Sequence, residues 1–129
     1  MVNQLLASEM KIGETFYAVT RKDFRMWLAR HHEQKEEIWL IFHYKSTGKP
    51  NISYNDAVEE AICYGWIDSQ AGPMDKERFV RRFSPRRKQS GWSKYNKERA
   101  LRMLCEGKMT PAGLALLPMD VLIEGHRQE

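Results

Sequence analysis

The chain has 129 residues, a hydrophobic content of 42% and a net charge of +4, which suits one domain with a substantial core. No run approaches the roughly 18 to 20 apolar residues of a membrane span, and no cationic flank precedes an apolar stretch at the start, which argues against membrane insertion and secretion. The two cysteines, Cys63 and Cys105, match no metal or redox spacing and are expected to be reduced thiols in a cytoplasm.

No internal repeat, low-complexity tract or linker divides the chain, so residues 1–129 are predicted to form a single domain. After a short tail, the expected elements are an edge strand at 15–19, an amphipathic helix at 21–31, a central strand at 38–44, a helix from Ser53 to a stop at Gly65, strands at 66–70 and 77–83, a long helix from Ser93 to about Cys105, and a short terminal helix from Thr110.

These boundaries rest on local signals. Thr20 and Ser53 each begin a capping-box pattern, and the apolar run at 38–44 is typical of a strand buried on both faces. Gly72 and Pro73 are expected to form the turn of a hairpin. The order predicts an α+β domain, in which a small antiparallel or mixed sheet of about four strands is covered by about four helices.

Charge is concentrated in one segment of the chain. Residues 75–102 contain eleven Lys or Arg against three Asp or Glu, a net charge of +8, whereas the segments before and after each have a net charge of −2. This distribution predicts a local cationic surface that would meet phosphates or another acidic partner. The plainer alternative is a solvated face on which arginines pair with carboxylates.

Strand periodicity places some of these charges beside aromatic rings. Because alternate side chains of a strand share a face, Trp66 is expected beside Asp68, with Ile67 pointing into the core. In the next strand, Arg81 is expected between two phenylalanines. A planar guanidinium there suits a carboxylate partner or a stacked base.

The segment after that strand has the features of an anion site. Pro85 stiffens a turn that displays cations just before a helix N-terminus, where free N–H groups attract anions. Asn96 is expected to face inward and to hydrogen-bond the loop around Arg86. The candidate ligand-binding residues are Trp66, Asp68, Arg81, Arg82, Arg86, Arg87, Lys88, Ser90, Trp92, Ser93 and Asn96.

Several linked motifs carry a family resemblance: EAICYGWID at 60–68, RFSPRR at 82–87, and GKMTPAG at 107–113. Together they resemble the YdeI/OmpD-associated family, also called bacteriocin-protection proteins, over about residues 24–113. The resemblance implies a fold and a bacterial context of envelope stress and bacteriocin tolerance, and it implies no active site. Many relatives continue into a C-terminal helical module that this chain, ending at Glu129, is expected to lack.

Three functions remain open. The leading prediction is a non-catalytic domain that binds an anionic ligand, nucleic acid or an acidic protein through its cationic segment. One alternative is a small enzyme in which Asp68 is a general base beside an arginine-bound substrate, and another is a protein-interaction module. Glu59 and Glu60 are expected on a solvated helix surface, and a carboxylate pair between Glu60 and Asp68 is less favoured.

No cofactor or metal is expected. The four histidines have no metal-ligand spacing, and no phosphate-cradling glycine loop, nucleophile elbow or zinc motif occurs in the sequence.

Overall fold

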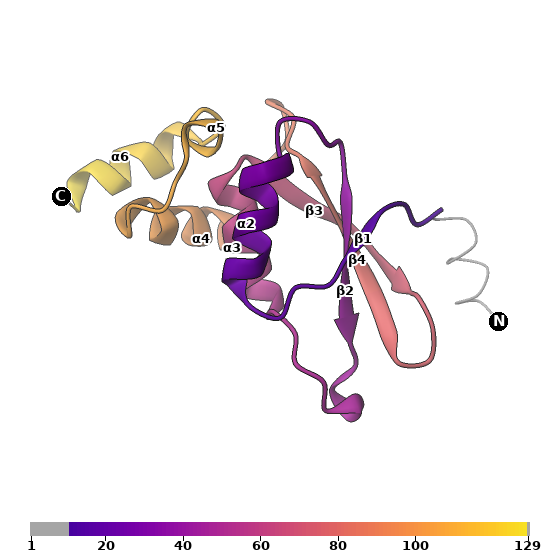
Figure 1. The fold of residues 1–129 in the computed structure, drawn as a ribbon. Coiled ribbons are helices and arrows are strands. Elements are labelled where there is room, and N and C mark those ends of the chain that lie inside the picture. The colour runs from indigo at the N-terminus through magenta and orange to yellow at the C-terminus, as the bar shows by residue number, and fades with distance from the viewer. Residues whose placement is uncertain (1–10, 129) are drawn as a thin grey trace.

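Four strands form one mixed sheet with helices packed against one of its faces, in a computed structural model that describes residues 11–128 (Figure 1). The strands are β1 (Thr15–Phe16), β2 (Ile38–His43), β3 (Trp66–Pro73) and β4 (Arg78–Pro85). The helices are α2 (Arg21–His31), α3 (Tyr54–Cys63), α4 (Lys94–Cys105), α5 (Pro111–Leu114) and α6 (Met119–Arg127), and a 3-10 turn, η1 (Lys45–Thr47), follows β2. The predicted α+β class is confirmed. Most of the expected N-terminal tail lies outside the described residues.

The strand order is β1-β2-β4-β3, so β2 lies inside the sheet as its apolar run predicted. β1 runs parallel to β2, and the two other pairs are antiparallel. Trp39 and Leu40, which point to opposite faces of β2, are both buried. The edge strand is shorter than expected, because only Thr15 and Phe16 pair with β2.

The hairpin between β3 and β4 turns later than Gly72 and Pro73, so that prediction was wrong. Both residues belong to β3, where they pair with β4. The turn instead depends on Asp75, whose Oδ1 accepts the N–H groups of Glu77 at 2.9 Å and Arg78 at 2.8 Å. An Asp side chain that binds the backbone two residues ahead forms a turn without glycine.

Side-chain caps set the helix starts where the sequence predicted them. At α2, Thr20 Oγ1 accepts the Asp23 N–H and the Asp23 carboxylate accepts the Thr20 N–H, so both halves of the capping box form. At α3, Ser53 Oγ accepts the Asp56 N–H at 3.1 Å. Gly65 follows α3 with a φ of 75°, a conformation that favours glycine.

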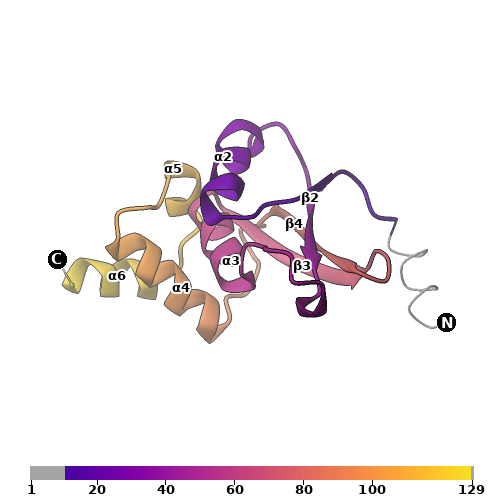
Figure 2. The same cartoon turned by 60° about the horizontal axis from the view of Figure 1, so that its bottom comes forward.

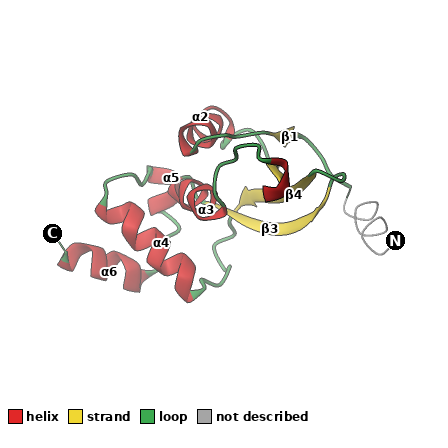
Figure 3. Cartoon of the chain, turned by 90° about the horizontal axis from the view of Figure 1, so that it is seen from below, coloured by secondary structure: helices red, strands yellow, loops and turns green. Residues whose placement is uncertain are grey.

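The helices form two layers over the sheet. α2 and α3 cover the sheet, and the main core lies between these helices and the sheet. There, Phe24 of α2 contacts Phe83 of β4 with ring centroids 5.3 Å apart. α4 packs on the far side of α3 (Figure 2). α6 lies against α4 and was not predicted from the sequence (Figure 3).

The short helix α5 is tied to the end of α3 by close backbone packing. Thr110 Oγ1 donates to the Cys63 carbonyl at 2.6 Å and caps α5. A Cβ atom at Gly113 would lie 2.7 Å from the Ile62 carbonyl oxygen and closer still to that of Cys63. Gly113 is therefore required by this contact.

We predict that Gly113→Ala lowers the free energy of unfolding by about 2–3 kcal/mol, because backbone atoms must move to admit the methyl group. Gly91→Ala is the matched control, since within residues 11–128 no atom lies within 4 Å of its Cβ position. Urea unfolding of both variants measures the difference. Equal stability of the two variants would contradict the close packing at Gly113.

Candidate functional site

Nine of the eleven arginines in residues 11–128 fall into two groups, and the other two, Arg30 and Arg87, are exposed. Six of them lie within 4.0 Å of a carboxylate: Arg21, Arg25, Arg78, Arg82, Arg102 and Arg127. Three others, Arg81, Arg86 and Arg99, have no carboxylate that close within residues 11–128 and lie over aromatic rings instead. The basic segment is therefore not one uniform surface.

The largest paired group is a buried network on α3. Glu59 and Glu60 are 2% and 1% exposed. Arg21 and Arg25 of α2 donate to Glu60 at 2.7 and 2.9 Å, and Arg102 of α4 donates to Glu59 at 2.6 Å. The prediction that both glutamates are solvated was wrong, because helices on both sides of α3 cover them and supply the opposite charges. Since Glu60 is held by two arginines, it does not form a carboxylate pair with Asp68.

Arg86 is a buried cation with an incomplete set of partners. It follows β4, and its side chain is 6% exposed. Its Cζ lies 3.8 Å from the centre of the Trp92 ring, and its Nη1 donates to the Gly91 carbonyl at 3.0 Å. Its Nη2 is buried and has no hydrogen-bond partner among residues 11–128. Burial lowers the pKa of Arg86, and the charge of Asp68 acts in the opposite direction.

Tyr54, the first residue of α3, joins the other two stacked arginines to Asp68. Its hydroxyl donates to Asp68 Oδ2 at 2.9 Å. The Cζ atoms of Arg81 and Arg99 lie 4.4 and 5.6 Å from the centre of its ring. Arg81 Nε is also buried, and the residues that the structure describes offer it no hydrogen-bond partner. Burial, followed by the hydrogen bond to Asp68, raises the pKa of Tyr54.

Arg99 is held by neutral groups. Its Nε donates to Asn55 Oδ1 and its Nη1 to Asn96 Oδ1, both at 2.9 Å. The sequence predicted that Asn96 bonds the loop around Arg86. Its side chain bonds Arg99 instead. Neutral amides orient the guanidinium and leave its charge uncompensated.

We call this group the stacked-arginine site. Its members are Tyr54, Asp68, Arg81, Arg86, Trp92 and Arg99, and the charge of Asp68, which acts on Arg86, links the Arg86–Trp92 pair to the other four. Three arginines and one aspartate give it a formal charge of +2. Planar, forked donors with a shortage of acceptors suit an oxyanion.

Two of the predicted site residues lie elsewhere. Trp66 is 1% exposed and lies in the core, with its ring centroid 5.7 Å from that of Trp27 on α2. Ile67, expected in the core, is only half-buried. Arg82 pairs with Glu37 at 2.6 Å. Because Arg82 and Arg81 are adjacent in a strand, they lie on opposite faces, and only Arg81 reaches the helices.

The remaining predicted residues surround the site. Arg87 and Lys88 are exposed in the loop between β4 and α4, and Ser90 is half-buried there. Ser93 is the N-cap of α4, and its Oγ accepts the Asn96 N–H at 3.1 Å. The two cations, Arg87 and Lys88, extend the positive surface beyond the stacked arginines.

Sequence reasoning missed two members of the site, Tyr54 and Arg99. Tyr54 shares a helical spacing with the apolar Ala57 and Ala61, which indicates a core position, and Arg99 is one of many charges on α4. Their proximity depends on the packing of α4 against α3, which no local pattern encodes. The one available signal was that Tyr54 directly follows an N-cap and so lies at a helix end.

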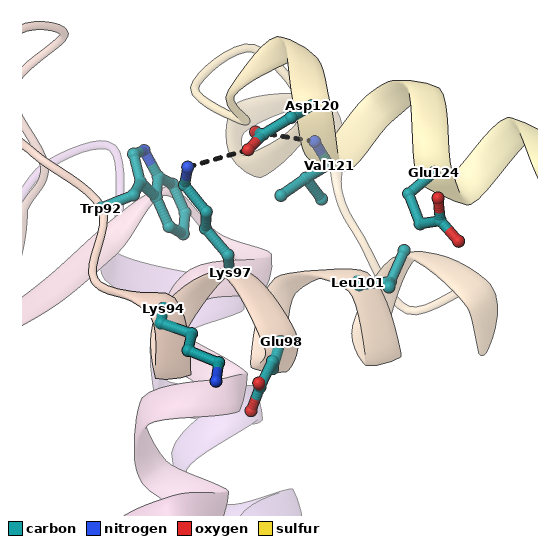
Figure 4. Close-up of a pocket in the computed structure, with 8 residues that line it drawn as sticks. All are labelled: Trp92, Lys94, Lys97, Glu98, Leu101, Asp120, Val121 and Glu124. Atoms are coloured by element: carbon teal, nitrogen blue, oxygen red, sulfur yellow. Dashed lines mark hydrogen bonds and ion pairs between the residues drawn. The ribbon is translucent and has the colours of Figure 1, made fainter.

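A pocket of about 390 Å³ borders the site between α4 and α6 (Figure 4). Trp92 forms one wall, and Leu101 and Val121 contribute apolar surface. Lys97 of α4 donates to Asp120 of α6 at 2.8 Å across the pocket. Both cationic and carboxylate side chains line this pocket, so its charge favours neither an anionic nor a cationic ligand.

Within residues 11–128 there is no group of three or more His, Cys, Asp or Glu side chains placed to hold a metal ion. No helix in that range combines the length and the apolar composition that a membrane crossing requires.

We predict that the two cysteines differ strongly in reactivity. Burial raises the pKa of the Cys63 thiol to about 11, so its reactive thiolate is scarce at about pH 8 and becomes abundant only near pH 11, whereas Cys105 is exposed. Iodoacetamide at about pH 8 should therefore alkylate one thiol in the native chain and two in urea, as measured by mass spectrometry. Equal alkylation rates of Cys63 and Cys105 in the native protein would contradict the burial of Cys63.

The comparison with protein families covers most of this fold. Residues 16–116, which include every residue of the stacked-arginine site, match the family described as "Domain of unknown function (DUF8412)". Comparison with curated proteins and with solved structures finds no match. Because the matched residues span well over half of the chain, the protein belongs to this DUF8412 family.

Proposed function

We propose that this protein is a binding domain for phosphate-bearing ligands, nucleotides or nucleic acid, and that the stacked-arginine site receives a phosphate group. The observation that carries the proposal is Arg86, a nearly fully buried guanidinium whose Nη2 has no acceptor within the described part of the chain.

Leaving such a group unpaired is costly. A buried donor without an acceptor costs about 1–3 kcal/mol, and more when it is charged. The same chain supplies buried glutamates to Arg21, Arg25 and Arg102. The absence of a carboxylate within 4.0 Å of Arg86 among the described residues is therefore best explained by an anion that arrives from outside.

Charge and geometry favour phosphate among the anions. A phosphate monoester carries a charge close to −2 near neutral pH, which balances the +2 of the site. Guanidinium groups bind two phosphate oxygens with parallel N–H donors. Exposed Arg87 and Lys88 lie in the adjoining loop, where they would attract further phosphates of a longer ligand.

The enzyme alternative depends on Asp68, whose carboxylate accepts the Tyr54 hydroxyl. That contact gives Asp68 a structural role in holding Tyr54 beneath Arg81, and it does not favour catalysis. The protein-interaction alternative has some support from Met119 and Ile123, which are exposed one helical turn apart on α6. An acidic protein partner would use the same arginines as a phosphate.

The motif resemblance to YdeI/OmpD-associated proteins supports a broader part of the proposal. It suggests that phosphate binding serves a bacterial response to envelope stress or bacteriocins. The resemblance does not identify the ligand.

We predict that wild-type protein binds nucleotides or oligonucleotides saturably, and more weakly at about 200 mM than at about 50 mM salt. Arg86→Gln should weaken binding roughly ten- to a hundredfold, the loss expected for hydrogen bonds between charged groups. Isothermal titration calorimetry measures both effects.

Two further variants make the test specific. Arg30→Gln removes the same charge from an exposed position of α2 and should leave binding unchanged. Arg81→Gln should weaken binding, and it guards against a folding defect in Arg86→Gln, which circular dichroism would reveal. If both site variants bind with wild-type affinity, the stacked-arginine site is refuted. If the protein binds acidic peptides and none of the phosphate-bearing ligands, the natural ligand of the site is an acidic protein.

A further inference from the structure

We infer that Gly91 and Trp92 form a gate over Arg86, which closes on the guanidinium in the free protein and is displaced when a phosphate binds. This inference rests on the proposed function and adds how the ligand gains access.

The gate consists of two adjacent residues that hold the same side chain. The Gly91 carbonyl accepts from Arg86 Nη1 at 3.0 Å, and the Trp92 ring covers the guanidinium at 3.8 Å. Both residues belong to the loop between β4 and α4 and lie outside any helix or strand. Movement of this one loop segment would therefore release both contacts together.

The closed arrangement leaves no route for an anion to Nη2. That atom has less than 1 Å² of exposed surface, although no described residue forms a hydrogen bond with it. A ligand can use this donor only after a neighbouring group moves. Gly91 is exposed and has open space around its Cβ position, so side chains do not restrain the loop at this residue, whereas the Trp92 ring packs against the core and must leave that contact when the gate opens.

Exchange of partners would favour opening. In the closed state the guanidinium contacts a neutral carbonyl and a neutral ring. In a guanidinium–phosphate pair both the donor and the acceptor are charged, whereas in the bond to the Gly91 carbonyl only the donor is charged, and a phosphate can take two donors of the fork at once. The ring competes with the ligand for Arg86, so removing the ring should strengthen binding.

Trp92 is a natural reporter of this motion. The other three tryptophans, Trp27, Trp39 and Trp66, are 7%, 1% and 1% exposed, whereas Trp92 is half-buried. Acrylamide quenching therefore reports mainly on Trp92. Acrylamide is neutral, so it does not compete with an anion for the site.

The experiment uses inorganic pyrophosphate, which has no ring to stack on Trp92, and a short oligothymidylate, which has both phosphates and rings. We expect pyrophosphate to increase acrylamide quenching of the wild-type protein. Trp92→Leu should bind pyrophosphate roughly two- to thirtyfold more tightly, the range of a lost cation–π contact. Arg86→Gln should bind pyrophosphate roughly ten- to a hundredfold more weakly and show no quenching response at the pyrophosphate concentration that saturates the wild type.

The outcomes separate the gate from the binding site. If Trp92→Leu binds pyrophosphate no more tightly and quenching does not rise, while Arg86→Gln still loses binding, the gate is wrong and the proposed function stands. If wild type binds neither probe, or Arg86→Gln binds both normally, the proposed function and the gate fail together. If Trp92→Leu does not fold, the wild-type quenching alone decides the gate. Weaker oligothymidylate binding by Trp92→Leu, without tighter pyrophosphate binding, would make Trp92 a stacking platform and overturn the gate.

Discussion

The arrangement of the helices depends on two buried carboxylates. Glu59 and Glu60, side by side on α3, are neutralised from both flanks, by arginines of α2 on one side and Arg102 of α4 on the other. A buried carboxylate without its partner is very costly, so these contacts keep the three helices in a single relative position. The position of α4 then determines where Trp92 and Arg99 lie. The stacked-arginine site is thus a consequence of the ion network beside it.

The two groups of arginines show how one composition serves structure and binding. Arginines that hold helices together have carboxylates within the chain, whereas Arg81, Arg86 and Arg99 lie over rings, which stabilise the guanidinium without neutralising it. Aromatic faces allow a cation to stay in a half-buried place while it keeps its capacity for an anion. The segment charge of +8 conceals this division, since it counts paired and unpaired arginines alike.

Local chemistry explains why the elements could be predicted. The caps at Thr20 and Ser53, the glycine after α3 and the apolar run of β2 act over a few residues, and each lies where the sequence indicated. The hairpin turn was misplaced because Asp75 forms it through its side chain, a signal weaker than Gly72 and Pro73 in the sequence. The prediction of the second helical layer omitted α6, because no capping side chain marks the start of this helix.

The sequence by itself determined the α+β class, the order of the sheet-forming and helical segments, and the placement of Arg81 among aromatic rings, because periodicity and caps are local properties. Only the tertiary structure decided which charges are paired. Trp66 and Asp68 share a face of β3 but have different surroundings. Trp66 lies in the core because α2 covers it, whereas Asp68 bonds Tyr54 because α3 begins beside it. Glu59 is buried by its contacts with Arg21 and Arg102, which lie far from it in the chain, whereas none of residues 11–128 supplies a carboxylate to Arg86. Pairing over such distances has no local signature.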